Sequence, residues 1–134
     1  RQVYDGVKIF DGDLKEFELA DVKILSEKVS LQKGTINNGG SNVYELSVQN
    51  GAKVVMVAEN TSNNNKEFFE FGVIDNGTDI FHTEYGNVRT GEQLIVPVFE
   101  KTASGFARVN FDIGSSVTAG HNVVVTIVSN INKK

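Results

Sequence analysis

Two histidines and a few carboxylates are the residues of this chain whose types could support catalysis. Acyl transfer needs a nucleophile beside a base, but the chain has no cysteine and no serine in a Gly-x-Ser-x-Gly elbow. His82 and His121 stand far apart in the sequence. An ordinary surface or core histidine is the simpler interpretation of each.

Paired carboxylates are the other catalytic option, because glycoside hydrolases place two acids face to face. The acids on predicted strands are Glu67, Glu70, Glu84 and Asp112. Each alternates with apolar residues, which is typical of a solvent-exposed strand face. The sequence therefore predicts no catalytic residue, and a small enzyme of jelly-roll type ranks behind the two functions described below.

Two aspartate-rich segments carry the oxygen ligands that calcium prefers. They are Asp11-Gly12-Asp13 and Asp75-Asn76-Gly77-Thr78-Asp79. Neither matches the EF-hand loop, which ends on a glutamate. Because tight turns require the same residue types, we predict turns at both places, and we expect no metal and no other cofactor.

The charge of the chain argues against a general nucleic-acid-binding function. Its 17 acidic and 13 basic residues give a formal net charge of −4, whereas binding to phosphates requires a basic face. No apolar run approaches the ~20 residues of a membrane helix. We therefore expect neither nucleic acid nor a membrane among the partners.

Alternation of apolar and polar residues predicts β-strands along most of the 134 residues. Strands are expected at 43–49, 53–60, 67–75, 78–85, 93–101, 106–113 and 122–129. The apolar spacing within 13–27 fits either a helix or a strand with a kink, and we favour the kinked strand. Turn signals recur every ~8–12 residues, as in sandwiches and barrels. The fold class predicted is all-β, a single antiparallel β-sandwich domain (jelly-roll or Ig-like) of about seven or eight strands.

Turn residues and strand phase refine this prediction. Asn50-Gly51 and Asn76-Gly77 are hairpin signals, because Asn and Gly tolerate positive φ. Pro97 has no N–H to donate, so its strand is expected at a sheet edge or at a bulge. The apolar phase of the strands predicts a core of Leu46, Val48, Phe69, Phe71, Val73, Val109, Phe111, Val125 and Ile127.

Three segments in the second half of the chain carry a family resemblance. They are Phe71–Val88, which contains Thr83-Glu84-Tyr85-Gly86, then Gly105–Phe111 and Asn122–Ile127. Over residues 71–134 the chain resembles a β-sandwich module of the structural (virion) proteins of tailed bacteriophages. It departs from that module where Ser115-Ser116-Val117-Thr118 replaces a closing Thr-Pro turn. The resemblance implies a virion component and implies no catalytic residue.

Two functions follow as hypotheses. The first is a non-enzymatic structural protein of a phage particle (capsid decoration, tail, baseplate or fibre component), located in the virion and assembling with other virion proteins or copies of itself. The alternative is a carbohydrate-binding or adhesin module that recognises a surface glycan. Its candidate contacts are Tyr44, Asn63, Asn64, Asn65 and Tyr85, because aromatic faces and amides suit sugars.

Residues 1–41 are less regular than the rest and are expected to include a packing arm. Their apolar residues include Val3, Tyr4, Val7, Ile9 and Phe10. A disordered tail would be poorer in such side chains, so we expect them to pack either on their own core or on a neighbouring subunit. The chain begins with Arg1, as a processed product or an excised domain would.

Overall fold

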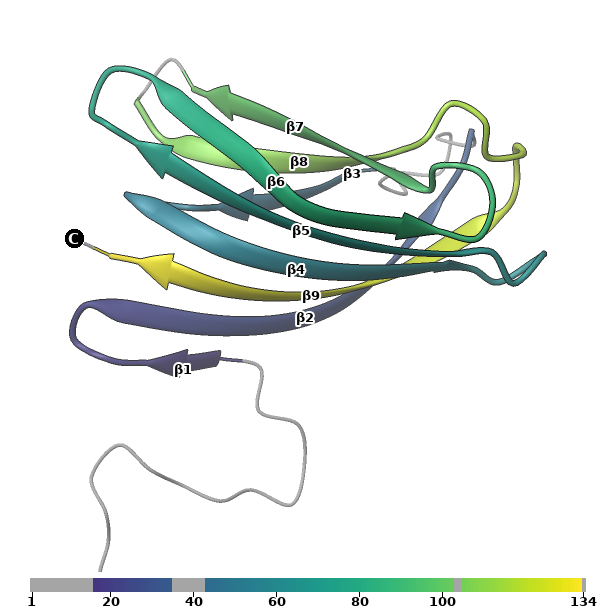
Figure 1. The fold of residues 1–134 in the computed structure, drawn as a ribbon, viewed down its shortest axis with the longest axis horizontal. Coiled ribbons are helices and arrows are strands. Elements are labelled where there is room, and N and C mark those ends of the chain that lie inside the picture. Colours follow the sequence, from purple (N-terminus) through teal and green to yellow (C-terminus); the bar gives the residue numbers. More distant parts are fainter. Residues whose placement is uncertain (1–15, 35–42, 103–104, 134) are drawn as a thin grey trace, which may run out of the picture.

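The computed structural model describes residues 16–34, 43–102 and 105–133, and in this part of the chain it contains nine β-strands and no helix. One antiparallel sheet has six strands in the order β1 (Glu16–Glu18), β2 (Val22–Gln32), β9 (Asn122–Asn132), β4 (Gly51–Asn60), β5 (Lys66–Asp75) and β6 (Ile80–Arg89). The other has the order β3 (Val43–Ser47), β8 (Ala107–Ile113) and β7 (Ile95–Lys101). The three-stranded sheet forms a second layer beside the longer one, which confirms the predicted sandwich (Figure 1).

The core lies between the two sheets and is built by strand alternation. All nine residues predicted for it are buried, with at most 2% of their surface exposed. Phe71 is central, because its ring lies 5.7 Å from that of Phe69, 5.2 Å from that of Phe99 and 6.2 Å from that of Phe111. The side chains of β5 thus contact aromatic residues of both β7 and β8.

One of the two predicted hairpins is wrong. β3 pairs with β8, whereas β4 pairs with β5 and β9, so the chain crosses from one sheet to the other at Asn50-Gly51. Both flanking strands have an apolar phase, and a local turn signal does not reveal that they belong to opposite layers. Asn76-Gly77 does join the paired strands β5 and β6, with Gly77 at φ 97°. Pro97 lies on β7, an edge strand, as expected.

Residues 16–32 are more regular than their sequence suggests. Val22–Gln32 pairs along its whole length with β9, and Glu16–Glu18 pairs with β2. These two strands belong to the domain itself, so residues 1–41 are not an arm throughout. Val3, Tyr4, Val7, Ile9 and Phe10 lie outside the described residues. In the described part of the chain, no helix is long and apolar enough to cross a membrane.

Candidate binding surface

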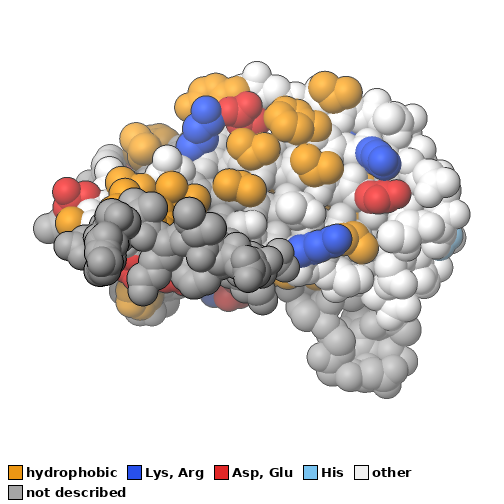
Figure 2. Space-filling view, turned by 90° about the horizontal axis from the view of Figure 1, so that it is seen from below, with side chains coloured by type: hydrophobic (Ala, Val, Ile, Leu, Met, Phe, Trp, Pro, Cys, Tyr) orange, Lys and Arg blue, Asp and Glu red, His pale blue; other side chains and the backbone are white. Residues whose placement is uncertain are grey.

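The outer face of the six-stranded sheet, turned away from the core, carries a row of exposed apolar side chains. Val57 of β4 pairs with Phe68 of β5, which pairs with Val88 of β6. These side chains are 46%, 37% and 64% exposed, and Val128 of β9, on the neighbouring row, is 44% exposed. We call these four residues the apolar band. Figure 2 shows hydrophobic side chains gathered on this side of the molecule, with few charged ones among them.

A groove of about 560 Å³ lies on the same face, at the end where β4 begins and β9 ends. Its walls include Ile74, Phe81 and Tyr85 on β5 and β6. Its polar lining includes Lys53 together with Asn130 and Asn132 of β9. We call it the Tyr85 groove.

A β-bulge presents Tyr85 to this groove. Glu70 pairs with Gly86 and Phe71 pairs with Glu84, so Tyr85 is the extra residue on β6. Its ring lies across Gly72, where an added Cβ would be 2.7 Å from the tyrosine hydroxyl oxygen. The side chain is nevertheless 62% exposed. The bulge and the glycine together offer a flat aromatic surface to solvent.

Lys53 borders this aromatic surface. Its ammonium lies 5.9 Å from the centroid of the Tyr85 ring and forms an ion pair with Glu70 at 3.0 Å. The hydrogen bond from Lys53 to Glu70, followed by the charge of that carboxylate, raises the pKa of the lysine. The groove therefore combines apolar walls, amide groups and a lysine whose charge is already balanced.

The structure separates the five predicted ligand contacts. Only Tyr85 lines the groove. Tyr44 lies in the three-stranded sheet with its ring 5.9 Å from that of Phe111. Burial, and to a lesser extent Glu27, raise the pKa of Tyr44 to about 12.

The three predicted asparagines lie in the loop between β4 and β5. The amides of Asn63 and Asn65 both donate to the carboxylate of Glu92, and the backbone N–H of Asn64 donates to the carbonyl of Asn60. The side-chain amides of Asn63 and Asn65 therefore bind within their own chain, and the loop lies at the other end of β4 and β5 from the groove.

Phe81 and Asn130 are groove residues that sequence reasoning missed as ligand contacts. Phe81 lies on a predicted strand, whereas Asn130 lies one residue beyond the strand predicted at 122–129; in β6 and β9 both are in the phase opposite to the core. The outward orientation of these two side chains could be predicted from the alternation of residues along each strand. Phe81 alternates with His82, and Asn130 is out of phase with the apolar positions 123, 125 and 127. What the sequence does not reveal is that β6 and β9 contribute to one groove across β4 and β5.

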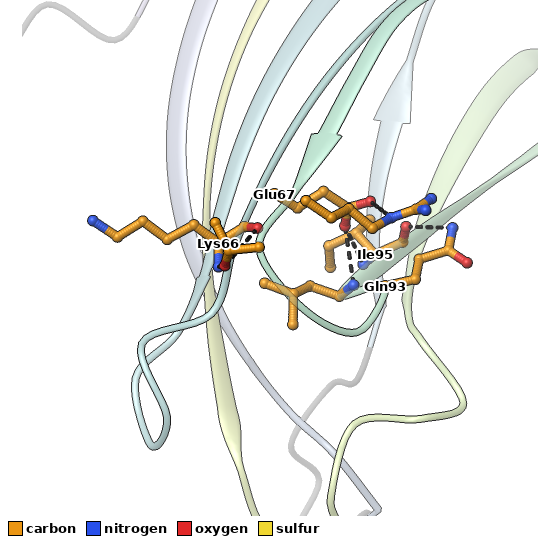
Figure 3. Close-up of polar contacts among 7 residues, drawn as sticks. Lys66, Glu67, Gln93 and Ile95 are labelled. Atoms are coloured by element: carbon orange, nitrogen blue, oxygen red, sulfur yellow. Dashed lines mark hydrogen bonds and ion pairs between the residues drawn. The ribbon is translucent and has the colours of Figure 1, made fainter.

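Glu67 is not on a solvent-exposed face, contrary to the prediction. It is 1% exposed and accepts hydrogen bonds from the backbone N–H groups of Leu94 and Ile95, each at 3.0 Å. It also accepts one from Nε of Arg89 at 2.7 Å (Figure 3). With these three hydrogen bonds the carboxylate holds the segment between β6 and β7.

The remaining chemically active residues also have structural contacts. The His82 ring stacks on Phe99 with centroids 3.8 Å apart, and Nδ1 of His121 lies 3.1 Å from the amide of Asn60. The Asp75 carboxylate accepts hydrogen bonds from Lys101 at 2.6 and 2.7 Å. Within residues 16–34, 43–102 and 105–133, no group of three or more His, Asp or Glu side chains is placed to hold a metal ion.

Comparison with known proteins gives partial structural likenesses. No family model and no curated protein matches the sequence. The tailspike protein of Acinetobacter baumannii phage AM24 is 11% identical over 84% of this chain and 26% of its own, with a TM-score of 0.47. That of Acinetobacter phage vB_ApiP_P1 is 13% identical over 98% of this chain and 25% of its own, with a TM-score of 0.42. The chain thus spans about a quarter of the length of each tailspike.

Proposed function

We propose that this chain is a non-enzymatic structural protein of a phage particle that acts by assembly with copies of itself. The observation that carries the proposal is the apolar band. Monomeric proteins seldom leave a contiguous apolar patch of this kind exposed, and such patches mark interaction sites. The resemblance of residues 71–134 to a phage structural module supports the particle as the setting, as capsid decoration, tail, baseplate or fibre component.

The proposed occupant of the apolar band is the N-terminal segment of a neighbouring copy. Residues 1–15 precede β1, which forms one edge of the sheet that carries the band. The six strands of the sheet are separated by five inter-strand spacings, so β1 and β6 lie about 24 Å apart. Fully extended, a segment as long as residues 1–15 reaches about 50 Å, so it could cross to another copy. Val3, Tyr4, Val7, Ile9 and Phe10 supply matching apolar side chains.

Deletion of residues 1–11 tests this proposal. We expect the full chain to be oligomeric by light scattering, and the shortened chain to be monomeric with an unchanged melting temperature. The double variant Val57→Ser with Val88→Ser should also be monomeric, because it removes the exposed apolar surface without touching the core. Ile74→Ser is the matched control, since Ile74 is 57% exposed on the same face but lies outside the band.

Two results would overturn the proposal. One is a full chain that stays monomeric at high concentration. The other is a shortened chain that keeps its oligomeric state. A shortened chain with a collapsed melting temperature would show instead that the N-terminal segment packs on its own domain.

A further inference from the structure

We propose that the Tyr85 groove is a binding site for a neutral oligosaccharide. This inference goes beyond the assembly function proposed above and does not depend on it, because the groove and the apolar band are formed by different residues of the same sheet face. Three properties of the groove carry it: a fixed aromatic surface, amide groups beside it, and the absence of an unbalanced charge among its described lining residues.

The aromatic surface is fixed by the backbone. Tyr85 can lie across β5 only because residue 72 is glycine, and its ring remains 62% exposed. Phe81 and Ile74 pair across β6 and β5 and add a second apolar wall, with 51% and 57% of their surfaces exposed. Sugar rings have apolar C–H faces, and a rigid aromatic side chain offers such a face a large contact area at a low entropic cost.

The amide groups lie across the groove from the aromatic wall. Asn130 is exposed on β9 and pairs with Lys53 of β4, while Lys53 pairs with Gly72 beneath the tyrosine ring. The Asn130 amide has donor and acceptor atoms, so it can match a hydroxyl pair whichever way the hydroxyl protons point. A small-molecule site is usually lined by apolar side chains together with a few polar groups.

Charge and size narrow the class of ligand. The ammonium of Lys53 is paired with Glu70 at 3.0 Å, so no lysine or arginine among the described lining residues is left unpaired to attract an acidic sugar. A volume of about 560 Å³ falls within the range of small-ligand sites, which is roughly 300–1,000 Å³. The groove therefore fits a few neutral sugar units.

An array of immobilised oligosaccharides, with neutral and uronic-acid-containing members, is the first test. We expect the full chain to bind neutral members. The strongest neutral member is then titrated against isotope-labelled protein by NMR, where the amides of residues 72, 85 and 130 should shift. Binding to no member, or only to acidic members, would overturn the proposal.

Variants locate the site. Tyr85→Ala should weaken binding at least ~10-fold, about 1.4 kcal/mol or more, whereas Tyr85→Phe should keep most of it because the ring remains. Gly72→Ala should weaken binding with the ring still present, because the new methyl group occupies the place of the tyrosine hydroxyl. Phe106→Ala is the matched control, since this aromatic side chain is 67% exposed and does not line the groove.

Each variant is first checked for an unchanged melting temperature. If Tyr85→Ala and Phe106→Ala bind the oligosaccharide equally well, the groove is not the site. A monomeric full chain that still binds sugar through Tyr85 would contradict the assembly proposal alone.

Discussion

Arg89 donates its Nε–H to the carboxylate of Glu67 at 2.7 Å, and the two residues are register partners on β6 and β5. The Glu67 side chain has no exposed surface, whereas that of Arg89 is 37% exposed. Because the same carboxylate accepts the N–H groups of Leu94 and Ile95, it links β6, at the edge of the large sheet, to β7, in the small sheet. A single buried acid thus joins the two layers.

Removal of this acid should be costly. Glu67→Ala leaves two buried backbone N–H groups and an arginine without their acceptor, and we expect a loss of about 3–5 kcal/mol in the free energy of unfolding. Glu67→Gln keeps an acceptor oxygen and should lose less. Urea denaturation measures both. Glu70→Gln is the control, because its partner Lys53 is 61% exposed and such pairs contribute about 1 kcal/mol or less. A loss below ~1 kcal/mol for Glu67→Ala would show that the link is dispensable.

The inward position of Glu67 could have been predicted from the sequence. Phe69, Phe71 and Val73 were assigned to the core, and Glu67 lies two residues before Phe69 on the same strand. The period of two therefore places it inward as well. A charged residue type favours the solvent-exposed face, but at Glu67 the phase of the strand determines the position. A charged residue is excluded from a buried position only when it has no partner there. The partner of Glu67 is Arg89, which lies 22 residues further along the chain and is therefore not evident from the local sequence.

Other features depend on contacts that no local pattern reveals. The core phases of the strands were predictable, because each strand carries its own alternation. The sheet change at Asn50-Gly51 and the bulge at Tyr85 were not, because both depend on which strand pairs with which. The groove depends on the same pairings, and therefore only one of its residues was identified from the sequence.

Phe111→Ala should destabilise the domain by about 3–5 kcal/mol, because a large side chain is deleted from a packed core. Phe111 has no exposed surface, and its ring contacts those of Tyr44 and Phe71. Phe81→Ala, at a residue that is 51% exposed, should cost less than about 1 kcal/mol. Equal losses in thermal and urea unfolding for the two variants would mean that the aromatic core is placed incorrectly.

Tyr44 should make stability depend on alkaline pH. Burial raises its pKa from 10.0 to about 12 in the folded chain. A raised pKa gives a contribution to stability that is fully present below the unfolded value and is lost as the pH rises through the folded one, here from about 10 to 12. Tyrosinate absorbance should show an ionisation step near pH 12 that Tyr44→Phe lacks. If Tyr44→Phe leaves the absorbance titration unchanged above pH 11, Tyr44 is not the tyrosine that ionises near pH 12.

Calcium is expected to leave the melting temperature unchanged at millimolar concentration, because the best aspartate-rich turn already uses its oxygen atoms. The Asp75 carboxylate accepts hydrogen bonds from Lys101 and from the N–H of Gly77, and Oδ1 of Asn76 accepts those of Thr78 and Asp79. The hydrogen bond from Lys101 is also the main reason why the pKa of Asp75 is lowered. A cation would have to displace that ammonium group, and ligands raise the melting temperature only if they bind the native state. Thermal melts with calcium and with chelator should therefore coincide for the full chain.

A rise of several degrees in the melting temperature with calcium, absent in Asp75→Asn, would instead establish a calcium site. Lys101→Met removes the ammonium group from the Asp75 carboxylate, so weak calcium binding would first be seen in this variant.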